Sequence, residues 1–176
     1  MKPINSPLRG WLGGKYRLAK TIVPLIPEHT CYAEVFAGAA WILMHKQPSK
    51  SEVLNDINAD IINVYRCVKS HLPELLRQLE GMIPSRDEFT RLRSTNPDTL
   101  TDIQRAARFI YLHRLVFGGH INGSFAATVE KSPKFNASKL VDELALSQHQ
   151  RLPHNIAKYH PMIVYTPPPQ QLRLKQ

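Results

Sequence analysis

Residues 31–56 read CYAEVFAGAAWILMHKQPSKSEVLND and contain two short apolar runs that each end in turn residues. The first run ends at Gly38 and precedes a helical segment over residues 41–45. The second run, residues 52–54, is followed by turn residues and then by a helical pattern over residues 61–68. Two consecutive strand-turn-helix units predict an α/β fold with a parallel, doubly wound sheet.

Helices are expected on both sides of this region. Apolar residues at helical spacing predict a first helix over residues 15–26, and residues 71–117 show helical patterns only. The last helix of that stretch has the clearest start signal, because Thr101 and Gln104 have the spacing of a capping box. Residues 118–119 are both glycine, as expected just beyond a helix end. Residues 117–135 are rich in Gly, Asn, Ser and Lys, which predicts a loop or hairpin.

The composition favours a globular protein that meets a polyanion. The chain has 23 Lys and Arg against 14 Asp and Glu, a formal net charge of +9, and such a field attracts nucleic acid above all. No apolar run approaches the roughly 20 residues that span a bilayer. The first ten residues lack the apolar core of a signal peptide. We therefore expect a cytoplasmic protein that does not enter a membrane.

The two cysteines, Cys31 and Cys67, stand far apart and outside any Cys/His cluster. This pattern predicts buried reduced thiols rather than a disulfide or a metal site.

Gly38 and Asp56 point to a nucleoside ligand. A glycine at the end of a strand lets the backbone approach a ligand closely, and an acid at the end of the next strand can accept hydrogen bonds from a ribose diol. Asp56 lies 18 residues after Gly38, near the expected spacing of about 20. The alternative is a plain tight turn at Gly38 and a helix N-cap at Asp56. Ala40 stands where a dinucleotide fingerprint needs its second glycine, which disfavours nicotinamide and flavin enzymes.

Residues 9–15, RGWLGGK, invite comparison with a phosphate-binding P-loop. That loop needs glycine where Arg9 stands and Ser or Thr where Tyr16 stands, so an ATPase is disfavoured. What remains is the Trp11 ring and the Lys15 ammonium joined by a flexible glycine pair, an arrangement suited to enclosing a charged small molecule. The alternative is an exposed N-terminal turn with Trp11 packed on the core.

Three segments in order resemble the opening of Dam-type DNA adenine methyltransferases. They are residues 6–15 (SPLRGWLGGK), 32–40 (YAEVFAGAA) and 54–58 (LNDIN). The resemblance continues through residues 102–112 (DIQRAARFIYL) and 117–119 (FGG) to about residue 152. It therefore covers most of the chain.

The resemblance implies a Rossmann-like fold that depends on S-adenosylmethionine, with an incomplete sheet and a helical DNA-recognition insertion. The implied activity is site-specific methyl transfer to adenine N6 in double-stranded DNA, without a metal ion. A cognate restriction enzyme is a partner that such an activity allows, and the oligomeric state stays open. The implied parts are a cofactor-binding α/β part (residues 1–69), a target-recognition insertion (70–135) and a return toward the catalytic sheet (136–176).

The resemblance also assigns residues to the two ligands. Trp11 and Lys15 would line the cofactor pocket, Glu34 to Gly38 would form its floor, and Asp56 would bind the ribose. The complete cofactor set is Trp11, Lys15, Glu34, Phe36, Gly38 and Asp56. Basic residues of the insertion would contact DNA, mainly through phosphates, or would form a solvated basic face instead; they are Arg105, Arg108, Arg114, Lys131 and Lys134.

The sequence departs from the family pattern near its end. The family places Asp or Asn before Pro-Pro and an aromatic residue, where it orients and stacks the flipped base. Here the nearest text is VYTPPPQ at residues 164–170, and Thr166, Pro167 and Pro168 supply neither the acid nor the ring. We therefore assign no catalytic residue.

The amino-acid composition also changes near the end of the chain. Five of the 14 prolines fall in the last 24 residues, and seven residues follow Pro169. We expect a truncated or frameshifted form with a foreign tail from about residue 153, weak or inactive alone. The alternative is a divergent tail on a shortened but functional protein.

Two other functions stay open at this point. One is a non-catalytic DNA-binding module derived from such an enzyme. The other is a nucleotide-dependent enzyme of another kind, supported only by the generic strand-glycine-acid pattern. A methylation assay beside a DNA-binding assay would separate the first from the methyltransferase.

Overall fold

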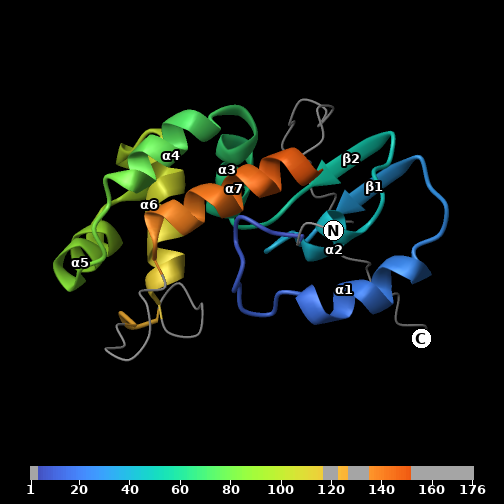
Figure 1. Ribbon diagram of the computed structural model, residues 1–176, viewed down its shortest axis with the longest axis horizontal. Helices are drawn as coiled ribbons and strands as arrows, with labels where there is room; N and C mark the ends of the chain where they lie inside the picture. Colours follow the sequence, from blue (N-terminus) through green and yellow to red (C-terminus); the bar gives the residue numbers. More distant parts are fainter. Residues whose placement is uncertain (1–3, 117–122, 127–134, 152–176) are drawn as a thin grey trace, which may run out of the picture.

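The computed structural model describes residues 4–116, 123–126 and 135–151, with side chains up to residue 145. The helices within residues 72–115 cluster at one end of the molecule. The two strands lie at the other end together with the helices of residues 16–22 and 41–45, and the helices of residues 59–70 and 137–151 lie between the two ends (Figure 1). The elements along the chain are α1 (Tyr16–Ile22), η1 (Val23–Leu25), β1 (Cys31–Glu34), α2 (Trp41–His45), β2 (Ser51–Leu54), α3 (Ala59–Ser70), α4 (Leu72–Glu80), α5 (Arg86–Ser94), η2 (Pro97–Thr99), α6 (Asp102–Leu115) and α7 (Ala137–Arg151).

Strands β1 and β2 form a parallel pair, in a register that places Cys31 opposite Ser51 and Glu34 opposite Leu54. Parallel strands need a crossover connection, and the segment containing α2 supplies it. The predicted strand-turn-helix order and the parallel pairing are confirmed. The part of the chain that the structure describes contains this one two-stranded sheet.

Strand β1 ends earlier than the predicted run of residues 31–37. Asn55 N–H donates to the Glu34 carbonyl, and Ala37 N–H donates to the Asn55 carbonyl, both at 2.9 Å. Because both bonds meet at Asn55, Val35 and Phe36 bulge out of the ladder between them. The Phe36 side chain is 75% exposed as a result.

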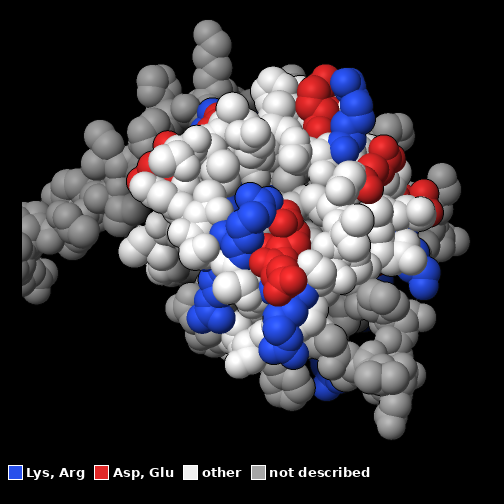
Figure 2. Space-filling view, turned by 90° about the vertical axis from the view of Figure 1, so that its left-hand side faces the viewer, with Lys and Arg blue, Asp and Glu red and all other residues white. Residues whose placement is uncertain are grey.

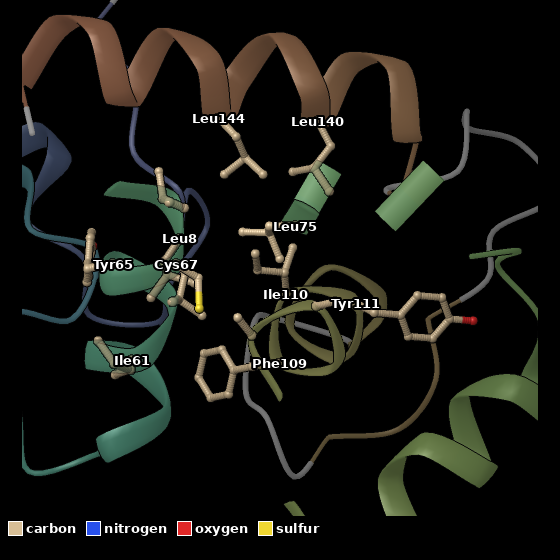
Figure 3. Close-up of a cluster of buried hydrophobic side chains, with 14 of the residues drawn as sticks. Leu8, Ile61, Tyr65, Cys67, Leu75, Phe109, Ile110, Tyr111, Leu140 and Leu144 are labelled. Atoms are coloured by element: carbon tan, nitrogen blue, oxygen red, sulfur yellow. The ribbon is translucent and has the colours of Figure 1, made fainter. Parts of the chain in front are cut away.

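One hydrophobic core joins the strand end of the molecule to the helical end. Helix α6 packs against α3, α4 and α5, and α7 lies across α4 and α3. Figure 3 shows Leu140 and Leu144 of α7 pointing toward Leu75 of α4 and Ile110 of α6. The leucines of α4 recur at helical spacing and form an apolar stripe, since Leu72, Leu75 and Leu79 are buried and Leu76 packs against the core.

The predicted first helix divides into α1 and the 3₁₀ turn η1. Pro24 lies inside η1 and has no backbone N–H to continue an α-helical ladder. The helical pattern is therefore correct, and its second half takes a tighter form.

The prediction for the cysteines is half wrong. Cys67 is buried in α3, but Cys31 is exposed at the start of β1, and both thiols are free. Strand β1 alternates its faces, and the face that carries Cys31 and Ala33 is exposed. Within the described residues, no group of His, Cys, Asp or Glu could hold a metal ion, and none of the helices there is long and apolar enough to cross a membrane.

The predicted loop or hairpin is described only in part. Val116 and Phe125 form an isolated antiparallel bridge, which agrees with a chain that turns back on itself. Lys131, Lys134, Thr166, Pro167 and Pro168 lie outside the described residues, as do the glycines expected to end α6.

The predicted capping box at the start of α6 is confirmed. Gln104 N–H donates to Thr101 Oγ1 at 3.3 Å, and Thr101 N–H donates to Gln104 Oε1 at 3.1 Å. We expect Thr101→Ala to lower the free energy of unfolding by about 1 kcal/mol, because it leaves a helix N–H without its acceptor. Urea denaturation measures this, with Thr90→Ala inside α5 as the control. An equal loss in both variants would show that the cap contributes nothing specific.

Candidate functional site

Asp56 joins the two loops at the carboxyl ends of β1 and β2. Gly38 N–H donates to its Oδ2 atom and Asn58 N–H donates to its Oδ1 atom, both at 2.9 Å. The N-cap of α3 is Asn58, whose side chain accepts from Asp60 N–H at 3.0 Å. Asp56 is therefore not the helix cap that the alternative interpretation required. Its carboxylate faces the glycine turn instead.

Gly38 occupies a position that other residues fit poorly. Its φ is +45°, in the left-handed region, and an added Cβ would lie 3.1 Å from two atoms of the Trp11 ring. Its carbonyl accepts a hydrogen bond from the Tyr65 hydroxyl at 2.9 Å. The turn is thus fixed from below by α3 and packed from the side by Trp11, and glycine leaves room for both.

Trp11 meets both expectations that the sequence left open. Its ring stacks on Phe109 of α6, with ring centroids 6.0 Å apart and planes 25° apart. It also lies 5.4 Å from the His113 ring. The ring is packed on the core, yet it also lines the cavity at the strand ends.

The strand ends surround a cavity of about 190 Å³. The N-terminal loop, the glycine turn, the start of α2 and the loop after β2 all contribute to it. The six residues predicted for the cofactor meet here although they come from three separate segments. The lining residues are Trp11, Gly13, Gly14, Lys15, Glu34, Phe36, Ala37, Gly38, Ala39, Ala40, Trp41 and Asp56.

The cavity is smaller than the roughly 300–1,000 Å³ of typical ligand pockets. A nucleoside-sized ligand would therefore extend past its mouth, toward the exposed Phe36 ring. Two larger hollows exist, one of about 920 Å³ among α4, α5 and α6 and one of about 810 Å³ beside Lys46. Neither of these two is lined by a glycine turn at a strand end, whereas the smaller cavity is lined by both Gly38 and Asp56.

Glu34 is the buried acid of this cavity, with 8% of its surface exposed. Leu43 N–H donates to its Oε2 atom at 2.9 Å. Burial raises the pKa of the Glu34 carboxyl to about 7, against the opposing effects of that hydrogen bond and of the nearby Lys15 ammonium. The charged form is costly without a partner. A cationic ligand would therefore stabilise the carboxylate, and the site favours positive charge at this point.

Comparison with known proteins adds the family. A model of the D12 class N6 adenine-specific DNA methyltransferases matches residues 11–149. The chain belongs to this family. The match includes the glycine turn, Asp56 and all of α6, so the same residues that build the cavity lie inside the family pattern.

Three relatives illustrate the family match. The type II methyltransferase M1.LlaDCHI of Lactococcus lactis is 30% identical over 79% of the chain and 53% of its own length. The DNA adenine methylase of Serratia marcescens is 31% identical over 65% of the chain and 44% of its length. The type II methyltransferase M.MjaIII of Methanocaldococcus jannaschii is 25% identical over 86% and 60%. The chain spans about half the length of the curated relatives it matches.

The three arginines of α6 make intramolecular contacts. Arg105 pairs with Asp60 of α3 and with Asp98 at 3.4 Å. Arg108 donates to the carbonyls of Leu92 and Arg93, at 2.6 and 3.3 Å. These contacts tie α6 to α3 and α5.

Arg114 extends the same arrangement to α7, because it pairs with Glu143 at 2.6 Å. Figure 2, which views the side of the molecule where α5 lies, shows basic and acidic side chains interleaved. Ion pairs also form within α5, between Arg91 and Glu88, and within α4, between Arg77 and Glu74. Contact of the predicted arginines with DNA stays a prediction, and their local charge is partly balanced.

Sequence reasoning missed several residues that shape the candidate cavity. Tyr65 holds the carbonyl of the glycine turn, Trp41 forms one wall, and His113 approaches Trp11. Tyr65 and His113 lie on apolar helix faces, where a buried side chain is the ordinary expectation. No local signal distinguishes them, because their partners are distant in the chain.

Proposed function

We propose that this chain binds S-adenosylmethionine in the cavity at the ends of β1 and β2 and serves the methylation of adenine N6 in double-stranded DNA. The observation that carries the proposal is the convergence of six residues from three separate segments on one cavity, in a chain of this family. S-Adenosylmethionine supplies the methyl group when bound. The chain's own residues bind and orient it.

The chemistry of the lining fits this ligand. The Asp56 oxygens already accept two backbone N–H groups, and a carboxylate has about four acceptor positions, so it can still accept ribose hydroxyls. The buried Glu34 favours the cationic end of the ligand. Gly38 keeps open a space that a Cβ would crowd against Trp11, and the exposed Phe36 ring offers a surface for stacking at the mouth.

The proposal extends to the architecture and to partners. The parallel pair β1–β2 would belong to a Rossmann-like sheet, residues 1–69 would form the cofactor part, and residues 70–135 would recognise DNA. The net charge of +9 supports binding to duplex phosphates. Two matched relatives are named type II methyltransferases, which supports a cognate restriction enzyme as a further partner.

The test has three readouts on the same chain: calorimetric titration with S-adenosylmethionine, titration with duplex DNA at two salt concentrations, and transfer of labelled methyl groups to mixed-sequence DNA. We expect cofactor binding, and DNA affinity that falls roughly 10³-fold or more between 50 and 200 mM salt if several phosphates are contacted. We expect methyl transfer only from a version extended with a family-type Asp-Pro-Pro-Tyr half.

The outcomes separate the candidate functions. DNA binding without cofactor binding would favour the non-catalytic DNA-binding module. Cofactor binding without DNA binding at low ionic strength would contradict the recognition part of the proposal. Turnover by the 176-residue chain alone would show that a residue in the stretch that departs from the family pattern is catalytic.

A further inference from the structure

The N-terminal segment that carries Trp11 is held in place by the helical end of the molecule. Leu8 is fully buried, and Figure 3 shows it beside α3 and below α7. The Arg9 carbonyl lies 3.3 Å from His113 Nε2. A carbonyl only accepts hydrogen bonds, so Nε2–H of His113 is the donor.

A second contact fixes the same residue from α7. The Arg9 guanidinium lies 3.6 Å from Glu143, whose other oxygen pairs with Arg114 of α6. The side chain of Arg9 is 62% exposed, so this ion pair is weaker than the contacts that lie below it. The His113 bond to the backbone of Arg9 is better protected, because His113 is 3% exposed.

Trp11 follows Arg9 by two residues and lies between the glycine turn and α6. On one side its ring is so close to Gly38 that a Cβ there would be 3.1 Å away. On the other side it touches Phe109 and His113. Helix α6 therefore supports, through Phe109 and His113, the ring that borders Gly38.

We propose that His113 is a positioning residue for the cofactor cavity. It donates a hydrogen bond to the backbone just before Trp11 and supports the ring itself, and so it sets the wall that faces Gly38. The inference rests on the proposed function, since the ligand is S-adenosylmethionine. It also connects the cavity to the recognition helices, because α6 carries the arginines that tie it to α3, α5 and α7.

The experiment compares three variants of the full chain. His113→Leu removes the donor, whereas His113→Gln retains an N–H that can reach the Arg9 carbonyl. Tyr111→Phe is the matched control on the same helix, since it removes a part-buried hydrogen bond of 2.9 Å to the Ile83 carbonyl, away from the cavity. The two tryptophans are labelled with 5-fluorotryptophan, and the fluorine NMR signal of Trp11 is assigned with Trp11→Phe.

We expect His113→Leu to shift the Trp11 signal and to weaken S-adenosylmethionine binding about 5- to 10-fold, the equivalent of one lost hydrogen bond. His113→Gln should restore both within about 2-fold. Tyr111→Phe should lower the melting temperature but leave the Trp11 signal and the cofactor affinity unchanged.

An unchanged Trp11 signal in a folded His113→Leu variant would overturn the proposal. Equal losses of affinity in His113→Leu and Tyr111→Phe would overturn it too, because His113 would then act only through overall stability. The wild-type chain could bind no S-adenosylmethionine while His113→Leu still shifts the Trp11 signal. In that case the proposed function fails and the positioning role of His113 stands.

Discussion

Replacing Asp56 with alanine is expected to remove most of the affinity for S-adenosylmethionine. The change deletes the acceptors proposed for the ribose and, in addition, the hydrogen bonds that hold Gly38 N–H and Asn58 N–H. Hydrogen bonds to a charged group contribute roughly 1.5–3 kcal/mol. A loss of that size lowers affinity about 10- to 150-fold, as calorimetry would measure.

Two comparisons make the Asp56 result specific. Lys15→Ala should lower the affinity for S-adenosylmethionine less than Asp56→Ala does, because the exposed Lys15 ammonium is screened by water. Asp60→Ala removes a nearby acid of α3 that pairs with Arg105 outside the cavity, so it reports the effect of destabilising the contact between α3 and α6 without changing the cavity lining. Equal losses in Asp56→Ala and Lys15→Ala, or a loss in Asp60→Ala as large as in Asp56→Ala, would contradict the assignment.

Replacing Glu34 with glutamine should stabilise the protein at high pH and weaken cofactor binding. Burial raises the pKa of Glu34 from 4.5 to about 7 in the folded protein. The folded state therefore holds the proton more tightly than the unfolded chain does. The stability that the protonated Glu34 gives to the folded state is fully present below pH 4.5 and is lost as the pH rises to about 7. Above that pH the folded protein contains a costly buried charge.

The expected difference in stability between Glu34→Gln and the wild type follows from the raised pKa. At pH 8, Glu34→Gln should be more stable than the wild type by about 3 kcal/mol, and at pH 5 by less than about 1 kcal/mol. Denaturant unfolding at the two pH values measures this. Cofactor affinity should change in the opposite direction, because the amide cannot balance a cation. A stability difference that is the same at both pH values would show that the carboxyl is not titrated between them.

Much of the local structure was predictable, because it depends on neighbouring residues. The capping box of α6 needs only Thr101 and Gln104, three residues apart, and the stripe of leucines on α4 needs only helical spacing. The end of β1 was not predictable from residues 31–37. Val35 and Phe36 leave the sheet because Asn55, just past the end of β2, accepts from Ala37 N–H and donates to the Glu34 carbonyl.

The candidate site shows the same division. Gly38 and Asp56 could be found from their spacing, the segment of residues 9–15 pointed to Trp11 and Lys15, and the resemblance to a family added Glu34 and Phe36. That Trp11 is supported by His113, and that Tyr65 holds the glycine turn, depends on contacts between residues that are 102 and 27 positions apart in the chain. Such pairs leave no pattern in a single sequence, because Tyr65 and His113 alone look like ordinary buried residues of a helix.

By itself, the sequence determined the order of strands and helices, the family, the net positive charge and the acid and glycine of the site. Only the tertiary structure decided how the charges are used. In the sequence, Arg105 and Arg114 cannot be told from any other surface cation. In the structure they form ion pairs with Asp60 of α3 and Glu143 of α7. The physical reason is that a side chain's charge is local information, whereas its partner and its exposure are set by how distant helices pack.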